Sequence, residues 1–163
     1  MAVQTTYSST ISAARAGMIA NTEPNVLISR TVETAAGVGF GVPVQKGTND
    51  DGCIIMASGA TEVLGITVRQ RNANPETPDK YAQYESARLM RKGVLWVTVT
   101  DAGGVADGDP VWVKLSDGTF SNADAGTAGS LRLGGGRWES TAANGALAKI
   151  RFDLDVPTIL GAA

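Results

Sequence analysis

The sequence predicts an all-β protein with a single compact β-barrel-like domain over residues 25–155 and an extended N-terminal arm. The first observation is a pair of β-branched runs, Val94–Thr100 and Val111–Leu115, whose composition and length are typical of strands. The second is the 20 glycines among 163 residues, which lie between short apolar runs without a triplet period. The third is the turn chemistry between the runs, as at Asp117-Gly118. Because many short strands leave exposed edges, we expect a closed or nearly closed barrel.

Residues 1–24 differ in composition from the rest of the chain. Ala2–Ser12 is mostly Ser, Thr and Ala with isolated apolar residues, so it offers little to a core. Ile11, Ala14 and Met18 mark one face of a short helix, although so short a helix is marginal by itself. A disordered terminus is the alternative. We expect an arm that becomes ordered on a neighbouring subunit. Removal of residues 1–20 should therefore hardly change the melting temperature of the isolated protein.

The first half of the domain contains several predicted strands. Val26–Val32, Cys53–Ala57 and Val63–Arg69 are apolar, β-branched runs of strand length. Arg71–Lys80, with its prolines and polar residues, is predicted to be a long exposed loop. Tyr81–Met90 is ambiguous, because its apolar spacing fits a helix although the segment runs directly into a strand.

The second half ends in a predicted hairpin. Asn144-Gly145 is the strongest hairpin signal of the chain and joins Arg137–Ser140 to an alternating final strand, Ala146–Leu154. Gly134–Gly136 is predicted to be a flexible turn in front of this hairpin. Residues 156–163 form a short apolar C-terminal tail.

The first and second halves of the sequence share a weak internal similarity, which we call the internal echo. Gly41–Lys46 resembles Gly108–Val113, and each segment leads to an Asp-Gly turn, at Asp51-Gly52 and at Asp117-Gly118. Two similar strand–turn–strand units explain the echo, and chance combined with turn chemistry is the alternative.

Charge and hydropathy exclude several partners. The net charge is −2, and no basic run is longer than Arg91-Lys92, so we expect no nucleic-acid partner. No apolar run is long enough to span a bilayer, and the N-terminus lacks the basic and apolar regions of a signal peptide. We therefore expect a soluble protein, made in a cytoplasm, that has no membrane partner.

The residue types needed for common catalytic and metal sites are missing. The chain has no histidine and one cysteine, Cys53, which excludes a Ser-His-Asp triad, a His metal site and a thiolate zinc site. Cys53 lies in an apolar run and is expected to be a buried hydrophobic residue. We expect no enzymatic activity and no cofactor.

The order and spacing of five segments resemble the structural cement (decoration) proteins of tailed bacteriophages. The similarity runs from about residue 1 to residue 151. The segments are Ile28–Glu33, Gly37–Gly41, Leu64–Arg69, Gly93–Val97 and Gly108–Val111. The resemblance implies a non-enzymatic virion structural protein that is made in the host cytoplasm and decorates the outer surface of an icosahedral head. It also implies binding to the major capsid protein, clamping of neighbouring subunits, and self-association, with a homotrimer favoured over a dimer.

Aromatic and apolar residues outside the expected core are the candidate interface. In an alternating strand, Trp96 and Trp112 each fall on the more polar face, where a large aromatic caps a barrel end or lies in a subunit interface. The interface candidates are Trp96, Trp112, Tyr7, Ile11 and Met18. The alternative function is a carbohydrate- or receptor-binding β-module of a phage tail or fibre, in which the tryptophans would stack on sugars.

Overall fold

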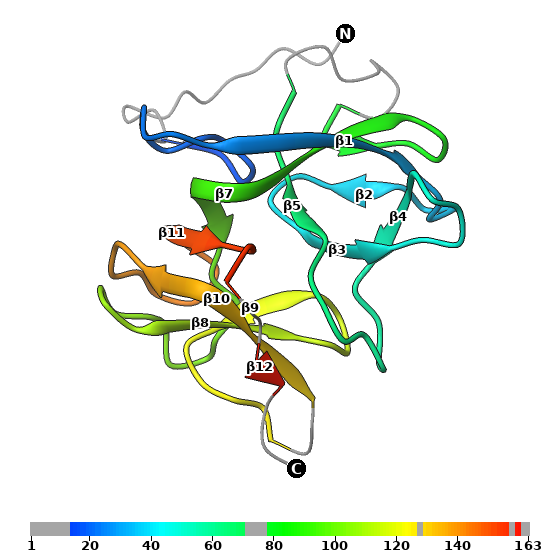
Figure 1. The fold of residues 1–163 in the computed structure, drawn as a ribbon. Helices are drawn as coiled ribbons and strands as arrows, with labels where there is room; N and C mark the ends of the chain where they lie inside the picture. Colours follow the sequence, from blue (N-terminus) through cyan, green and yellow to red (C-terminus); the bar gives the residue numbers. More distant parts are fainter. Residues whose placement is uncertain (1–13, 71–77, 127–128, 157–158, 161–163) are drawn as a thin grey trace, which may run out of the picture.

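The computed structural model describes residues 14–70, 78–126, 129–156 and 159–160, and all regular structure in these residues is β-strand (Figure 1). This confirms the all-β prediction. The strands are β1 (Val26–Val32), β2 (Val38–Gly39), β3 (Pro43–Lys46), β4 (Gly52–Ile55), β5 (Gly65–Thr67), β6 (Lys80–Tyr81), β7 (Ser86–Thr98), β8 (Pro110–Lys114), β9 (Thr119–Ser121), β10 (Ser130–Trp138), β11 (Leu147–Asp153) and β12 (Ile159–Leu160).

Five strands form a closed circuit of pairings, which we call the barrel half. β1 pairs with β4 in parallel, and antiparallel pairings then run from β4 to β3, β5, β7 and back to β1. Residues 86–92 of β7 take part in this circuit. The closed circuit agrees with the barrel-like prediction for this half. β2 and β6 form a separate two-stranded sheet.

The other strands form an open sheet, which we call the sheet half. Residues 92–98 of β7 pair with β11, and the order continues through β10 and β8 to β9, while β12 pairs with β10. Figure 1 shows β7 running from one half into the other. Gly93 lies where the pairing of β7 passes from β1 to β11; its φ is +137°, and a Cβ there would lie 3.0 Å from Asn25 Cβ and from Met90 Sδ. Glycine is therefore required where β7 passes between the halves.

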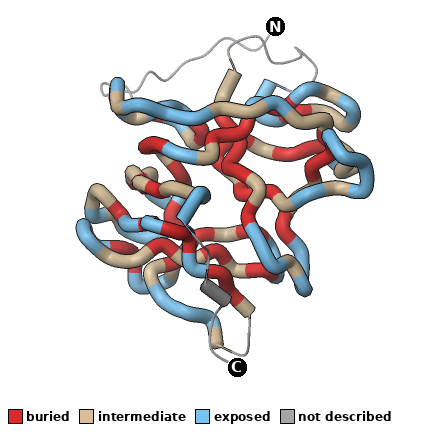
Figure 2. Tube along the Cα trace, in the orientation of Figure 1, coloured by how far each residue is buried: buried red, intermediate tan, exposed pale blue. Residues whose placement is uncertain are grey.

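Each half has its own cluster of buried side chains, visible as the red interior of Figure 2. The barrel half encloses eight buried residues, among them Val44 and Leu89. The larger cluster has nineteen buried residues, including the fully buried Trp138. It also contains Ile66 and Met90, which belong to strands of the barrel circuit. Because these outward-facing residues of the barrel half belong to the second core, the two halves pack against each other.

Several sequence predictions are confirmed and others are wrong. β1 matches the predicted strand Val26–Val32, and Ala148, Ile150 and Phe152 alternate inward in β11 as expected. Tyr81–Met90 contains β6 and the start of β7 and has no helix, because its residues pair with β1 and β2. Residues 71–77 of the predicted loop lie outside the described residues.

The glycine run before the last hairpin is strand, and the prediction of a flexible turn is wrong. Gly134–Gly136 lies inside β10. A Cβ on Gly134 would lie 2.0 Å from the carbonyl oxygen of Val156, so glycine allows the C-terminal segment to approach this strand. The turn at Asn144-Gly145 is present, with Ala146 N donating to Ala143 O over 3.1 Å, but it belongs to a connection longer than two residues.

The internal echo corresponds to two antiparallel hairpins, one in each half. β3 pairs with β4 across the Asp51-Gly52 turn, and β8 pairs with β9 across the Asp117-Gly118 turn. Each hairpin begins at a proline, Pro43 or Pro110.

Candidate interaction surface

The segment before β1 runs along β7 through an isolated β-bridge between Ile19 and Leu95, and it contains no helix between residues 14 and 24. Gly17 N donates to Trp96 O over 2.8 Å, Trp96 N donates to Met18 O over 2.9 Å, and Ala20 N donates to Val94 O over 2.9 Å. The helical interpretation through Ala14 and Met18 is therefore wrong. The backbone groups of this segment form hydrogen bonds with the edge of β7. A helix this short is only marginally stable and does not compete with these bonds.

Gly17 packs this segment tightly against the barrel half. Its N–H and C=O are both used, because its oxygen also accepts a hydrogen bond from Arg69 N over 2.7 Å. Its φ is +81°, and a Cβ would lie 2.8 Å from Phe40 Cβ and 2.9 Å from Gly41 N. Ala14 is buried as well. Residues 14–20 thus pack on the domain, and the expectation that removal of residues 1–20 hardly changes stability stays a prediction.

The structure brings two candidate interface residues together beside this segment. Met18 is 40% exposed, and its backbone pairs with that of Trp96, whose side chain is half-buried. The Lys149 ammonium lies 5.7 Å from the centroid of the Trp96 ring, in a cation–π arrangement. Ile19, bridged to Leu95, is also exposed. We call Met18, Ile19, Trp96 and Lys149, together with the charged residues described next, the arm-base surface.

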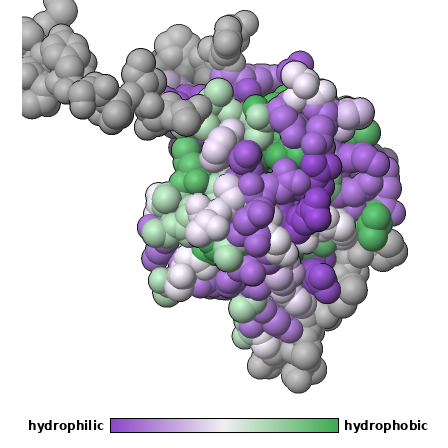
Figure 3. All heavy atoms as spheres, turned by 90° about the vertical axis from the view of Figure 1, so that its left-hand side faces the viewer, coloured by the Kyte–Doolittle hydropathy of each residue, from purple (hydrophilic) through white to green (hydrophobic). Residues whose placement is uncertain are grey.

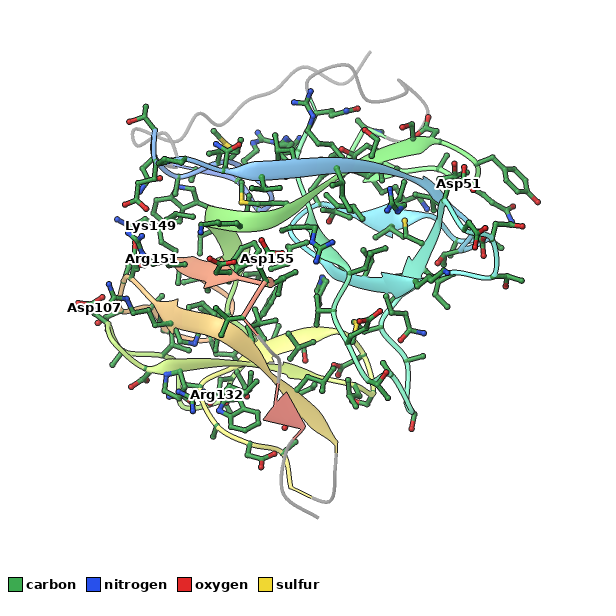
Figure 4. The ribbon with its side chains drawn as sticks, viewed as in Figure 1. Asp51, Asp107, Arg132, Lys149, Arg151 and Asp155 are labelled. Carbon is green, nitrogen blue, oxygen red and sulfur yellow. The ribbon has the colours of Figure 1, made fainter. Side chains whose placement is uncertain are left out.

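Charged side chains connect the end of the arm to the sheet half. Arg151 Nη2 lies 2.5 Å from Glu23 Oε1, and Arg151 Nε donates to Glu139 Oε1. The hydrogen bonds to Glu23 and then to Glu139 raise the pKa of Arg151, so its guanidinium stays charged. Figure 4 shows Lys149 and Arg151 on the same side of the molecule. The ion pairs hold residue 23, and with it the chain before β1, against β10 and β11.

A cleft of about 340 Å³ adjoins these ion pairs. It is lined by Glu23, Arg151, Lys92 and Asp153, among others, and Lys92 Nζ lies 2.6 Å from Asp153 Oδ2. Hydrogen bonding between these two residues lowers the pKa of Asp153 and raises that of Lys92. The charges of the cleft wall are therefore mutually compensated. Figure 3, which faces this side, shows hydrophobic and hydrophilic residues intermixed.

The other candidate residues lie elsewhere. Trp112 is half-buried on β8, opposite Arg132 of β10 and Ser121 of β9, and the sheet order places β11 and β10 between β7 and β8. It is therefore not part of the arm-base surface. Tyr7 and Ile11 lie outside the described residues.

Sequence reasoning missed one exposed aromatic residue. Tyr84 is 75% exposed on the turn between β6 and β7, and its φ is +66°. No sequence signal marked it, because such a backbone angle normally indicates glycine or asparagine.

Within the described ranges, no group of three or more His, Cys, Asp or Glu side chains is placed to hold a metal ion. Burial, and secondarily the charge of Glu33, raises the pKa of the Cys53 thiol to about 11, which keeps the thiol protonated near neutral pH. The described residues contain no helix that is long and apolar enough to cross a membrane.

Two solved structures share this fold. A chain in the capsid of Myoviridae phage XM1 superimposes with a TM-score of 0.74 at 22% identity, covering 94% of this chain and 98% of that one. The N base of the head fibre gp8.5 of bacteriophage phi29 gives a TM-score of 0.50 at 13% identity, with 80% and 96% covered. At these identities the likeness concerns the fold alone. A comparison with curated protein sequences found no match.

A family model described as structural cement protein (E217 gp24/Pam3 gp6) matches residues 3–153. The match covers most of the chain and confirms the resemblance carried by its glycine-rich strands. The chain belongs to the structural cement protein family, whose members are structural components of phage virions.

Proposed function

We propose that this virion protein decorates the outer surface of an icosahedral phage head and clamps neighbouring major capsid protein subunits, without enzymatic activity. The observation that carries the proposal is the arm-base surface. There a half-buried tryptophan and two exposed apolar residues lie beside a chain segment that is fixed to the domain. The protein would be made in the host cytoplasm before it joins the head.

The chemistry of the arm-base surface supports a protein partner. Trp, Met and Arg are enriched at protein interfaces, and buried tryptophans often dominate the binding energy. Trp96 and Met18 supply apolar contact area, while Arg151 and its carboxylates are already paired and need no partner. Residues 1–13 join the domain at Ala14 and would extend the contact over a neighbouring subunit.

Self-association is part of the proposal. A homotrimer is favoured and a dimer is the alternative, with Trp112 on the open sheet half as the candidate contact between copies. Sedimentation of the purified protein would distinguish the two states. Trp112→Ala should lower the association state while the monomer stays folded.

Binding to heads tests the main proposal. Heads that lack the protein are mixed with purified wild-type protein or with Trp96→Ala, and the bound fraction is measured against concentration. Removal of a central interface tryptophan should weaken binding by about 2 kcal/mol or more, which is roughly thirtyfold. Val156→Ser is the matched control, because Val156 is an exposed apolar residue outside the arm-base surface. Equal affinity for Trp96→Ala and wild type would exclude this face as the docking site.

A further inference from the structure

Tyr84 combines exposure with an unusual backbone conformation. Its 75% exposure is the highest among the large apolar residues that the structure describes, and in the same residues it is the only non-glycine with a positive φ. A side chain at φ +66° meets steric strain that glycine avoids and asparagine tolerates. Single exposed aromatics are common on protein surfaces, but an exposed aromatic that is kept at a strained position is not.

The turn that carries Tyr84 is tied firmly to the barrel half. Tyr84 N donates to Val32 O over 2.7 Å, at the end of β1. Ala82 N donates to Glu85 Oε2 over 2.8 Å, and Glu85 N returns a bond to Ala82 O over 3.2 Å. Gln83 Nε2 also donates to Glu33 O over 3.2 Å. These bonds fix the backbone of the turn and therefore the point on the surface from which the Tyr84 side chain projects.

Three acidic residues lie in this turn or near the adjoining end of β1. Asp51 lies beside the same end of β1, because Thr31 N donates to Asp51 O over 2.8 Å. Asp50 is fully exposed next to it, and its contact with Lys46 is a 3.5 Å pair between exposed side chains, which contributes little. Glu85 adds a third carboxylate. We call Asp50, Asp51, Tyr84 and Glu85 the Tyr84 tip.

We propose that the Tyr84 tip is a second docking point, which inserts the Tyr84 ring into an apolar pocket with a basic rim on a capsid subunit. A rigid tyrosine offers contact area at a low entropic cost, and the surrounding carboxylates complement a basic rim. The inference rests on the proposed function and deepens it. Asp51 lies at the opposite end of the molecule from Lys149 and Arg151 in Figure 4, so the tip and the arm-base surface can contact different subunits. Two opposed contacts are what a clamp requires.

The strained backbone allows a test in which stability and binding move in opposite directions. Tyr84→Asn removes the ring but tolerates the backbone angle, so its melting temperature should rise by about 2–4 °C. Its affinity for heads should fall at least about tenfold. Tyr84→Phe keeps the ring and should bind within about threefold of wild type, and Val156→Ser serves again as the exposed apolar control. Asp50→Asn should make head binding less sensitive to salt.

Unchanged head affinity of Tyr84→Asn would overturn the inference. A changed sedimentation coefficient with unchanged head affinity would overturn it as well, because the tip would then contact a second copy of this chain. If Trp96→Ala loses head binding and Tyr84→Asn does not, only the second docking point fails. If wild-type protein does not bind heads, the proposed function itself fails.

Discussion

The two halves of the molecule solve the problem of exposed strand edges in different ways. The barrel half closes its pairings into a circuit around a core of eight buried residues. The sheet half has nineteen buried residues in its cluster but leaves its sheet open. On one side of β7 its edge is covered by Gly17–Ala20. Closure pairs the edges of the barrel half within its own circuit, whereas the open sheet depends on an added segment to cover part of its edge.

The two proposed contact surfaces lie on different halves. The arm-base surface lies where the added segment covers the open sheet, and the Tyr84 tip lies on the closed half. Whether the halves behave as one body decides whether the tip and the arm-base surface can work as a clamp.

The largest expected effect comes from the core of the sheet half. Trp138→Ala removes a fully buried side chain and should lower the free energy of unfolding by about 3–5 kcal/mol. Because Ile66 and Met90 join the halves and β7 is shared, unfolding of both halves should shift together. Fluorescence of the remaining tryptophans follows the sheet half, and thiol labelling of the buried Cys53 follows the barrel half.

Trp112→Ala is the matched control for this experiment. Its side chain is half-buried in the same half, so truncation of Trp112 should cost under about 2 kcal/mol. If Trp138→Ala shifted the fluorescence transition and left Cys53 labelling unchanged, the halves would be independent units and the rigid clamp would be wrong.

Truncation of the N-terminus tests the added segment. Removal of residues 1–20 deletes the buried Ala14 and the backbone bonds to Val94, Trp96 and Arg69. At about 1 kcal/mol for each net hydrogen bond, the loss should be about 2–4 kcal/mol in denaturant unfolding. Removal of residues 1–13 should leave the transition within about 0.5 kcal/mol of wild type and reduce the occupancy of heads. Equal stability of both truncated forms would show that residues 14–20 are not integrated.

A substitution where β7 passes between the halves should have a smaller effect on stability. Gly93→Ala introduces a Cβ at φ +137° and 3.0 Å from Asn25 Cβ and Met90 Sδ, so it should cost about 1–3 kcal/mol. Gly108→Ala isolates the backbone part of this cost, because a Cβ there meets nothing within 4 Å at φ +91°. Thermal unfolding should therefore rank Gly93→Ala below Gly108→Ala, and the reverse order would contradict the packing at the passage.

Strand bounds and inward-facing residues could be predicted from the sequence where the local apolar pattern matches the burial in the fold. Ala148, Ile150 and Phe152 face inward in β11 as their alternation indicates, and β1 has its expected bounds. The proline-led hairpins were visible as an internal echo because turn chemistry and strand periodicity are both local.

The wrong predictions depend on contacts between distant segments. Gly134–Gly136 is strand and lies against the backbone of Val156, and residues 17–20 are not helical because their backbone groups bond to the edge of β7. The conformation of Tyr84 could not be predicted for the same reason, because its backbone angle is imposed by hydrogen bonds to β1 and between neighbouring turn residues. At the candidate surface, Trp96 and Met18 were named from the sequence, but their adjacency depends on the tertiary pairing.

The smallest expected effect is the contribution of Glu33, in the barrel half, to the pH dependence of stability. Glu33 accepts hydrogen bonds from Thr48 N over 2.7 Å and from Asn49 N over 2.9 Å, and these backbone groups lower the pKa of its carboxyl. Because the folded-state pKa lies below the ordinary value of 4.5, the carboxylate should stabilise the fold fully above that value. This stabilisation should be lost as the pH falls through the folded-state pKa.

Denaturant unfolding between about pH 6 and about pH 3 measures this loss. Glu33→Gln keeps the shape of the side chain without the charge, so its unfolding free energy should fall less steeply over this range than that of wild type. Glu62→Gln, an exposed glutamate outside the β3–β4 turn, is the control and should follow wild type. Because β7 and the larger core join the two halves, Cys53 labelling and tryptophan fluorescence should shift together as the pH falls, and Glu33→Gln should reduce both shifts. Loss of Cys53 protection at a higher pH than the tryptophan transition would contradict this expectation, because the β3–β4 turn would then open by itself and the two halves would differ in local stability.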